Sequence, residues 1–346
     1  MLRHSFTLTC VLLCAGASHA AAAPRADSVD SAALLRKFEP VLYFHAEEEW
    51  APERADTFVA RARVEKQAAR GKWLAQAGTL PTSTKGCTLK PCYRFNLPCV
   101  LRSGDACYEK SSATITDWKK PVVYGRLLDV PAGTPPPAGF ATAPRYLARY
   151  WLFYDFDDWH SPKKRLWQAH EADWESLTVA LGDALQPLFA AYSEHCSGTI
   201  RPWASVTKRG AWHPVDYVAL GSHANYFTNA STSTKLDECR NRYLNGTQLA
   251  RAKTLVKLAA DRIVDRTGTA HASGPAGLAG ITPLDLVELK APFPAWAPFP
   301  GLWSEGQLLW VGRTPTKLTS ILESGGPATP NWNATSVPSG WHATSS

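Results

Sequence analysis

The segment from His170 to Val179, which reads His-Glu-Ala-Asp-Trp-Glu-Ser-Leu-Thr-Val, holds the residues best suited to chemistry. On a β-strand, successive side chains point to opposite faces, so Asp173 and Glu175 would share one face with two apolar residues further along. That face begins with carboxylates and becomes hydrophobic, which is typical of a site at the rim of a β-sandwich. His170 lies in the turn before the strand and would point toward the same site.

A second acidic segment, Tyr150–Asp158, repeats this pattern, with Asp155 and Asp157 at the end of an apolar face. If the two segments pair as a hairpin, Asp155 or Asp157 would lie beside Asp173 and Glu175. Carboxylates this close repel one another unless a cation holds them. Carboxylate oxygens with one imidazole suit calcium, magnesium or manganese. We therefore predict a divalent-cation site with the ligands Asp155, Asp157, His170, Asp173 and Glu175. The alternative is a solvated acidic loop end neutralised by Lys163, Lys164 and Arg165.

A third polar segment, Ala219–Tyr226, places His223 at the end of another expected strand. Gly221, two residues earlier, allows a close approach of the backbone or a bend. His223 would be a further ligand, a catalytic general base or acid, or a hydrogen-bonded structural histidine. The sequence Gly-Ser-His-Ala differs from the Gly-x-Ser-x-Gly turn of serine hydrolases, which disfavours that class.

The acidic run Glu47–Glu49, between His45 and Trp50, is a weaker candidate. It would form either another loop at the rim of the site or an exposed acidic turn. Acidic side chains are mostly solvent-exposed in folded proteins. We therefore favour the exposed turn.

The elements around these segments indicate the fold. Arg145–Asp158, Glu171–Leu181 and Val215–Tyr226 alternate and are rich in aromatic and β-branched residues, so we expect strands there. Composition favours helices over 28–37, 55–77 and 247–263. Together these elements predict a mainly β protein, an antiparallel β-sandwich with peripheral helices and a disulfide-rich loop segment.

The first 23 residues predict a cleavable secretory signal. Arg3 supplies a positive start, Phe6–Ala15 is an uncharged apolar run, and small residues follow where a signal peptidase cleaves. The apolar run is too short for a membrane helix, which needs roughly 20 residues. We expect a secreted or periplasmic protein whose residues 24–346 form a single β-sandwich domain with helical insertions.

Six cysteines remain after the signal: Cys87, Cys92, Cys99, Cys107, Cys196 and Cys239. An even number in an oxidising compartment favours disulfides. The first four lie within a Gly- and Pro-containing insertion at 85–110, and the last two would join more distant segments. The spacings contain no Cys-x-x-Cys pair, which disfavours zinc. The sequence leaves the pairing open.

The formal net charge is +7, of which Arg3 in the signal contributes one. This charge favours anionic or glycan surface ligands and peripheral membrane contact. The basic residues form no dense run, which disfavours nucleic acid and keeps simple solubility as an alternative. The tryptophans expected to stack on sugars or enter an interface are Trp159, Trp167, Trp203 and Trp212. The cations expected to hold an anion are Arg201, Lys208 and Arg209.

Several blocks together resemble the vacuolar-protein-sorting sixty-two related family. They are Phe38–His45, Tyr150–Tyr154, His170–Glu175, Val218–Tyr226 and Phe299–Trp303, in that order. The blocks extend over most of the expected mature chain. This resemblance implies no established reaction for an exported protein.

The central block also resembles the necrosis- and ethylene-inducing-like cytolysins, whose signature is Gly-His-Arg-His-Asp-Trp-Glu. This chain has Ala-His-Glu-Ala-Asp-Trp-Glu over 169–175, so the ligand positions match while the first, third and fourth residues differ. The resemblance implies that His170, Asp173 and Glu175, with Asp155 or Asp157, hold a divalent cation. It also implies a β-sandwich with outer helices.

Three functions follow as hypotheses. The first is a secreted, divalent-metal-binding protein that docks on a cell-surface glycan or glycolipid and is cytolytic. The second is a metal-dependent hydrolase or lyase on an anionic polysaccharide or phosphodiester, with His223 as general base or acid. The third is an exported scaffold in which calcium is structural. The sequence does not distinguish between these three functions, and it does not indicate the oligomeric state.

Overall fold

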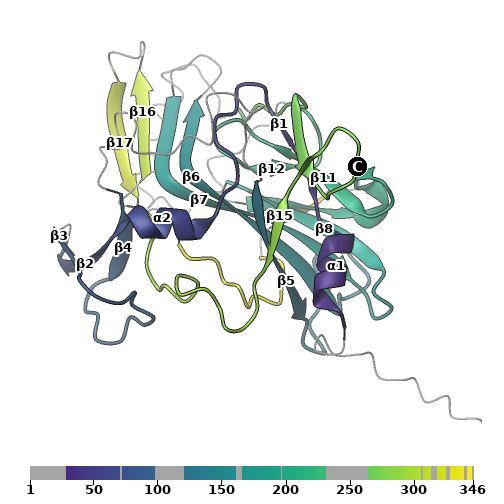
Figure 1. The fold of residues 1–346 in the computed structure, drawn as a ribbon, viewed down its shortest axis with the longest axis horizontal. Coiled ribbons are helices and arrows are strands. Elements are labelled where there is room, and N and C mark those ends of the chain that lie inside the picture. The colour runs from purple at the N-terminus through teal and green to yellow at the C-terminus, as the bar shows by residue number, and fades with distance from the viewer. Residues whose placement is uncertain are drawn as a thin grey trace, which may run out of the picture.

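The computed structural model describes residues 29–70, 72–97, 121–160, 166–195, 197–230, 264–304, 307–312, 318–324, 328–338 and 341–344. The expected signal peptide, the expected helix at 247–263, and Cys99, Cys107, Cys196 and Cys239 lie outside these residues. The described chain is mainly β, as predicted (Figure 1). None of its helices is long and apolar enough to cross a membrane.

A large sheet forms one layer of the molecule. Its strands follow the order β15 (Asp285–Glu288), β5 (Val122–Asp129), β6 (Tyr146–His160), β7 (Leu166–Leu181), β8 (Pro187–Glu194), β9 (Ser197–Pro202) and β18 (His342–Ala343). The start of β7 also pairs with β16 (Gln307–Gly312), which pairs with β17 (Leu318–Ser324). Most neighbours are antiparallel, whereas β15 with β5 and β18 with β9 are parallel.

A smaller sheet forms the second layer. Its order is β10 (Lys208–Arg209), β11 (His213–Val218), β1 (Val41–Phe44), β13 (His271–Gly274) and β14 (Thr282–Pro283), with β12 (Asn225–Tyr226) also paired to β11. A separate small sheet has the order β3 (Lys72–Ala75), β2 (Arg63–Ala69) and β4 (Tyr93–Asn96). The β1–β11 and β13–β14 pairs are parallel, so the antiparallel prediction holds for most strand pairs but not for all of them.

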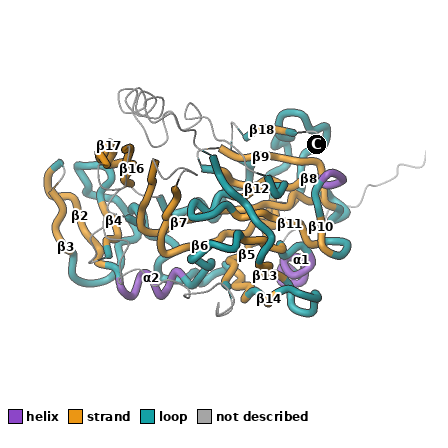
Figure 2. The backbone as a smooth tube through the Cα atoms, turned by 90° about the horizontal axis from the view of Figure 1, so that it is seen from above, coloured by secondary structure: helices purple, strands orange, loops and turns teal. Residues whose placement is uncertain are grey.

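The two larger sheets pack face to face, which confirms the predicted sandwich. The hydroxyl of Tyr192 on β8 donates to the carbonyl of Val215 on β11 at 2.9 Å. The same ring stacks on Phe227, after β12, with centroids 3.8 Å apart. These contacts join the two layers through a buried aromatic core. Figure 2 shows the backbones of β8 and β11 next to each other.

In the part of the chain that the structure describes, two short helices lie at the periphery. Helix α1 (Ser31–Lys37) begins where Asp30 accepts a hydrogen bond from the Ala33 amide, a normal helix N-cap. It buries Leu34 and Leu35 in the main core. Helix α2 (Ala55–Arg61) buries Phe58 against Phe153 of β6. A single 3₁₀ turn, η3, spans Trp203–Ser205.

The predicted helix at 55–77 is wrong beyond Arg61. The backbone turns extended at Ala62, and the rest of this segment forms β2 and β3. Strand β2 pairs with β4, more than 25 residues further along the chain, through registers such as Val64 with Phe95. Such long-range pairing overrides the local helix propensity of this Ala-, Arg- and Lys-rich stretch. Cys87 and Cys92, between β3 and β4, form a disulfide with Cα atoms 5.9 Å apart.

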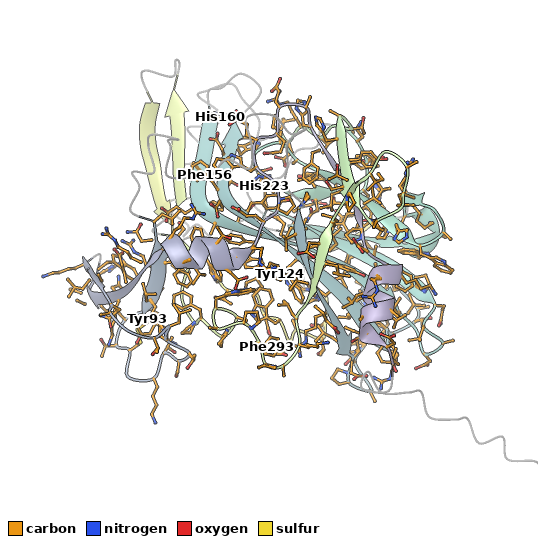
Figure 3. All side chains as sticks on the ribbon, viewed as in Figure 1. Tyr93, Tyr124, Phe156, His160, His223 and Phe293 are labelled. Atoms are coloured by element: carbon orange, nitrogen blue, oxygen red, sulfur yellow. A yellow bond between two sulfur atoms is a disulfide. The ribbon has the colours of Figure 1, made fainter. Side chains whose placement is uncertain are left out.

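The hairpin of β6 and β7 carries most of the predicted site. Its register sets Asp157 opposite His170, Tyr154 opposite Asp173, and Leu152 opposite Glu175. The predicted pairing of the two acidic segments is therefore confirmed. Figure 3 shows Phe156 and His160 along this hairpin, with His223 beside it.

Candidate functional site

The site begins with the pair formed by Asp157 and His170. Both side chains are buried, and Oδ2 of Asp157 lies 3.6 Å from Nε2 of His170. The other ring nitrogen, Nδ1, lies 3.1 Å from the carbonyl of Glu171 and 3.0 Å from that of Ala172. Carbonyls only accept hydrogen bonds, so Nδ1 carries a proton, and in the neutral form of the ring the lone pair would be on Nε2. This orientation presents Nε2 to the Asp157 carboxylate.

The backbone between His170 and Asp173 is unusual. Ala172 has φ of 50°, a left-handed conformation that residues other than glycine seldom adopt. The carboxylate of Glu171 accepts from the Leu97 amide at 3.4 Å. Asp155, across the hairpin, forms an ion pair with Arg61 of α2. The carboxylates of the hairpin therefore do not all share one partner, because Asp155 pairs with the guanidinium of Arg61.

Asp173 is paired with His223. The Oδ2 atom of Asp173 lies 3.0 Å from Nδ1 of His223, and Oε1 of Glu48 lies 3.6 Å from Nε2 on the other side of the ring. The ring also stacks on Tyr154, with centroids 3.8 Å apart and planes 4° from parallel. Burial lowers the pKa of His223, but the two carboxylates outweigh it and raise that pKa to about 10. His223 is therefore an imidazolium at neutral pH.

This state of His223 bears on the predicted catalytic role. A general base needs a free lone pair and access to the proton that it removes. The ring is completely buried, and each of its nitrogens faces a carboxylate. In this arrangement His223 is a buried charged partner of Asp173 and Glu48, and it has no lone pair with which to accept a proton.

Glu175 and Asp157 complete the cluster of buried carboxylates. The hydroxyl of Ser193 on β8 donates to Oε2 of Glu175. Burial, with the nearby charge of Asp173, raises the pKa of Glu175 well above its usual range. Burial also raises the pKa of Asp157 to about 7, with His170 opposing that shift and Asp173 adding to it. Asp157, Asp173 and Glu175 therefore influence one another, as the sequence predicted, and all three are buried rather than solvated.

Whether these residues suit a cation can be judged from their donor atoms. Carboxylate oxygens are the ligands that calcium, magnesium and manganese prefer, so Asp157, Asp173 and Glu175 fit these cations better than the imidazole of His170 does. A cation beside Asp157 would offset the cost of burying its charged form. In the part of the chain that the structure describes, no three His, Cys, Asp or Glu side chains converge as a group that could hold an ion. Binding would therefore need a movement of Asp173 or Glu175, or water molecules in the coordination shell.

A neighbouring buried network was not predicted. Nε2 of His195 lies 2.6 Å from Oδ2 of Asp265, and the hydroxyls of Ser222 and Tyr226 also donate to this carboxylate. Burial lowers the pKa of His195, but Asp265 outweighs it and raises the pKa to about 9. Asp265 is distant in sequence from the other members, so no local pattern could have indicated it.

The acidic run at 47–49 also differs from the prediction. Glu48 is buried, not exposed: its Oε1 accepts from the Glu49 and Trp50 amides, and its Oε2 accepts from the Gly221 amide at 2.8 Å. The predicted exposed turn is confirmed for Glu47 and Glu49, whereas the buried Glu48 fits the rim-loop alternative. Trp50 directly after this run is buried and was the only local signal of this burial.

The predicted ligand-binding residues come from several elements, and among them the Trp159 amide donates to Oδ1 of Asp157 at 3.3 Å. Trp159 is buried in the core, so its face is not available to a sugar. The side chain of Trp167 lies outside the described residues. Arg201 lies on β9, with its guanidinium 5.0 Å from the centre of the Phe227 ring. The residues Trp203, Lys208, Arg209 and Trp212 precede β11, whereas His223 follows it.

No protein-family model matches this chain, and the search of curated proteins gave no significant match. One solved structure that the chain is similar to is Necrosis and Ethylene inducing Protein 2 from the causal agent of cocoa's Witches Broom disease. The match has 18% sequence identity and a TM-score of 0.27, and covers 56% of this chain and 67% of that chain. A TM-score this low does not establish a shared fold. The comparisons assign the chain to no family, and the resemblance to the vacuolar-protein-sorting sixty-two related family stays a prediction.

Proposed function

We propose that the protein is an exported, divalent-cation-binding protein that docks on a glycan or glycolipid headgroup of a cell surface and is cytolytic. The observation that carries the proposal is the geometry of Asp157 and His170. Nε2 and Oδ2 face each other at 3.6 Å, which is too long for a hydrogen bond. Calcium binds its ligands at about 2.3–2.6 Å, so one ion can contact both atoms.

The residues that would hold the cation are Asp157 and His170, joined by Asp173 and Glu175. The two carbonyls that fix Nδ1 of His170 resemble the second-shell contacts that orient histidine ligands in metal sites. The disulfide between Cys87 and Cys92 supports an oxidising compartment such as the extracellular space or the periplasm. The cytolytic part of the proposal depends on the resemblance of the segment 169–175 to the cytolysin signature.

The geometry disfavours hydrolysis with His223 as the base. Its imidazole is buried between Asp173 and Glu48, and these carboxylates raise its pKa to about 10. A structural calcium scaffold stays an alternative, because the proposed ligands are buried. The proposed docking protein and the structural calcium scaffold differ in one respect: only the docking protein binds a surface when it is loaded with the cation.

The cation is tested by titrating the chelator-treated mature chain with calcium, magnesium or manganese, followed by calorimetry and thermal unfolding. At a cation concentration of 100 times Kd we expect a stabilisation of about 2.7 kcal/mol. Asp157→Asn and His170→Gln should abolish both signals. Asp155→Asn is the matched control, because Asp155 lies on the same hairpin but pairs with Arg61, and it should retain cation binding. If none of the three cations gives a heat of binding or a shift in the unfolding temperature, the cation site is excluded.

Docking is tested with glycolipid-containing vesicles loaded with a dye, with and without the cation. We expect binding and leakage only with the cation, and neither with Asp157→Asn. Cation binding without docking would support the structural scaffold instead. Docking that is indifferent to chelator and to Asp157→Asn would separate the site from the surface and contradict the proposal.

A further inference from the structure

A second surface feature lies away from the cation site. Trp212, in the turn between β10 and β11, is 41% exposed, and Leu74 on β3, at 49%, is the other large hydrophobic side chain exposed in the described residues. Strand β11, of six residues, separates Trp212 from the turn that carries His223. At about 3.3 Å per residue, that strand spans roughly 20 Å. Trp212 therefore does not belong to the Asp157 and His170 site.

Neighbouring side chains fix the orientation of the exposed Trp212 indole. Phe38, completely buried, packs edge-on against Trp212 at 5.9 Å and against Trp203 at 5.8 Å. The ammonium of Lys37 lies 4.2 Å from the centre of the Trp212 ring, a cation–π contact. The ring thus has a fixed orientation and a cation beside it, while a large part of its surface faces solvent.

The surroundings of Trp212 are cationic. Helix α1 ends with Arg36 and Lys37, and strand β10 consists of Lys208 and Arg209. Lys208 donates to the carbonyls of Trp203 and Val206, so its ammonium is fixed at the base of the turn. Arg209 is exposed. The acidic residue nearest to this helix end in the sequence is Glu39, which is buried, and 208–212 contains none.

We propose that this Trp212 patch, made of Lys37, Arg209 and Trp212 with Lys208 at its base, docks on an anionic phospholipid bilayer, with the indole in the headgroup layer and the exposed cations on lipid phosphates. Tryptophan favours this layer because one end of its ring is polar and the rest is apolar. Juxtamembrane lysines and arginines are attracted to anionic lipid surfaces. A partly exposed ring in a surface turn fits a flat surface better than a sugar, because sites for small molecules are concave. The inference rests on the proposed cell-surface docking but uses none of the residues of the cation site.

The test uses co-sedimentation of the mature chain with phosphatidylcholine vesicles, and with vesicles that also contain phosphatidylglycerol. Binding should require phosphatidylglycerol and weaken as salt is added. Trp212→Ala should reduce binding at least tenfold. Lys37→Gln and Arg209→Gln should each reduce it about fivefold, the usual effect of one cation near an anionic surface.

Leu74→Ala and Lys72→Gln are the matched controls, because they remove an exposed apolar side chain and an exposed cation from β3. This strand lies at the opposite end of the molecule from α1 and β11 (Figure 1). Both controls should bind as the wild type does. Trp212→Ala removes packing on Phe38 as well as exposed surface, so binding of all variants is compared at a temperature at which thermal unfolding shows each of them to be folded. If the control variants lose as much vesicle binding as Trp212→Ala does, the proposed role of the Trp212 patch is wrong.

A chelator separates this inference from the proposed function. Binding lost with Trp212→Ala but retained with chelator supports the patch and contradicts cation-dependent docking. Binding lost with chelator but unchanged in Trp212→Ala has the opposite meaning and overturns the patch. Binding to a soluble acidic polysaccharide that Trp212→Ala abolishes, without any binding to vesicles, would also overturn the lipid assignment.

Discussion

Nδ1 of His223 lies 3.0 Å from Oδ2 of Asp173, and the two residues are 50 positions apart in the sequence. Asp173 comes from the large sheet, whereas His223 comes from the turn that follows β11 in the small sheet. This buried ion pair therefore joins the two layers of the sandwich next to the candidate cation site.

Asp173→Asn removes the carboxylate from this pair and leaves the imidazolium with Glu48 at 3.6 Å. Because breaking a buried pair leaves an uncompensated charge, we expect a loss of about 3 kcal/mol in the free energy of unfolding, measured with urea at neutral pH. The pKa of His223 should fall from about 10, which NMR titration of the imidazole would detect. Asp285→Asn, at an exposed carboxylate 3.9 Å from Arg54, should change stability by less than about 0.5 kcal/mol. If the two variants have equal free energies of unfolding, the buried ion pair between Asp173 and His223 does not stabilise the fold as proposed.

Gly221→Ala should be strongly destabilising. Gly221 has φ of +74°, and a Cβ atom there would lie 2.4 Å from the Asp158 carbonyl oxygen of β6. Both backbone strain and steric overlap oppose the change, so we expect a loss of more than about 2 kcal/mol. Gly210→Ala has a similar φ of +61°, but the new methyl would meet only His213 Cδ2 at an ordinary contact distance of 3.8 Å, and the change should cost about 1 kcal/mol. Urea unfolding of both variants separates overlap from strain, and equal costs would mean that the contact with β6 is not tight.

Glu39→Gln should change the dependence of stability on pH. Glu39 is buried, and Oε1 has no hydrogen-bond partner among the described residues. Burial raises its pKa to about 7, with Arg36 opposing the shift. Because the folded-state pKa is the higher one, the carboxyl contributes fully below its usual pKa of 4.5, and the wild type loses this contribution as pH rises through 7. The loss should reach about 3 kcal/mol at most, and it should be absent in Glu39→Gln.

The control for that measurement is Glu47→Gln, at a carboxylate that is 66% exposed. Thermal unfolding between pH 4 and pH 8 should give parallel curves for the wild type and Glu47→Gln. A flat difference between the wild type and Glu39→Gln over this range would show that Glu39 has an ordinary pKa.

Local pattern was sufficient to predict the hairpin and its polar end. Alternation along β6 and β7 indicated two strands, and the carboxylates at their ends indicated where the polar cluster would form. Gly221 was expected to permit a close approach, and its backbone does lie against Asp158. These features depend on neighbours within a few residues, which a sequence displays directly.

Local pattern failed where a distant partner decides the outcome. Asp155 and Asp157 have equivalent positions in the sequence, but Arg61 from α2 pairs with Asp155 and leaves Asp157 to His170. The sequence predicts an exposed turn at Glu48, but in the fold this side chain is buried against the Gly221 amide and His223. The segment after Arg61 favoured a helix by composition but became a strand because β4 was available to pair with it.

The sequence by itself determined which segments become the main strands, where glycine must stand, and which donor atoms lie at the strand ends. Only the tertiary structure decided which of these groups meet, and which of them carry a proton. The physical reason is that strand periodicity is a local property, whereas charge and pKa depend on burial and on partners brought together from distant segments. His223 shows this most clearly: a strand-end histidine in the sequence, it is an enclosed imidazolium in the fold, between Asp173 and Glu48.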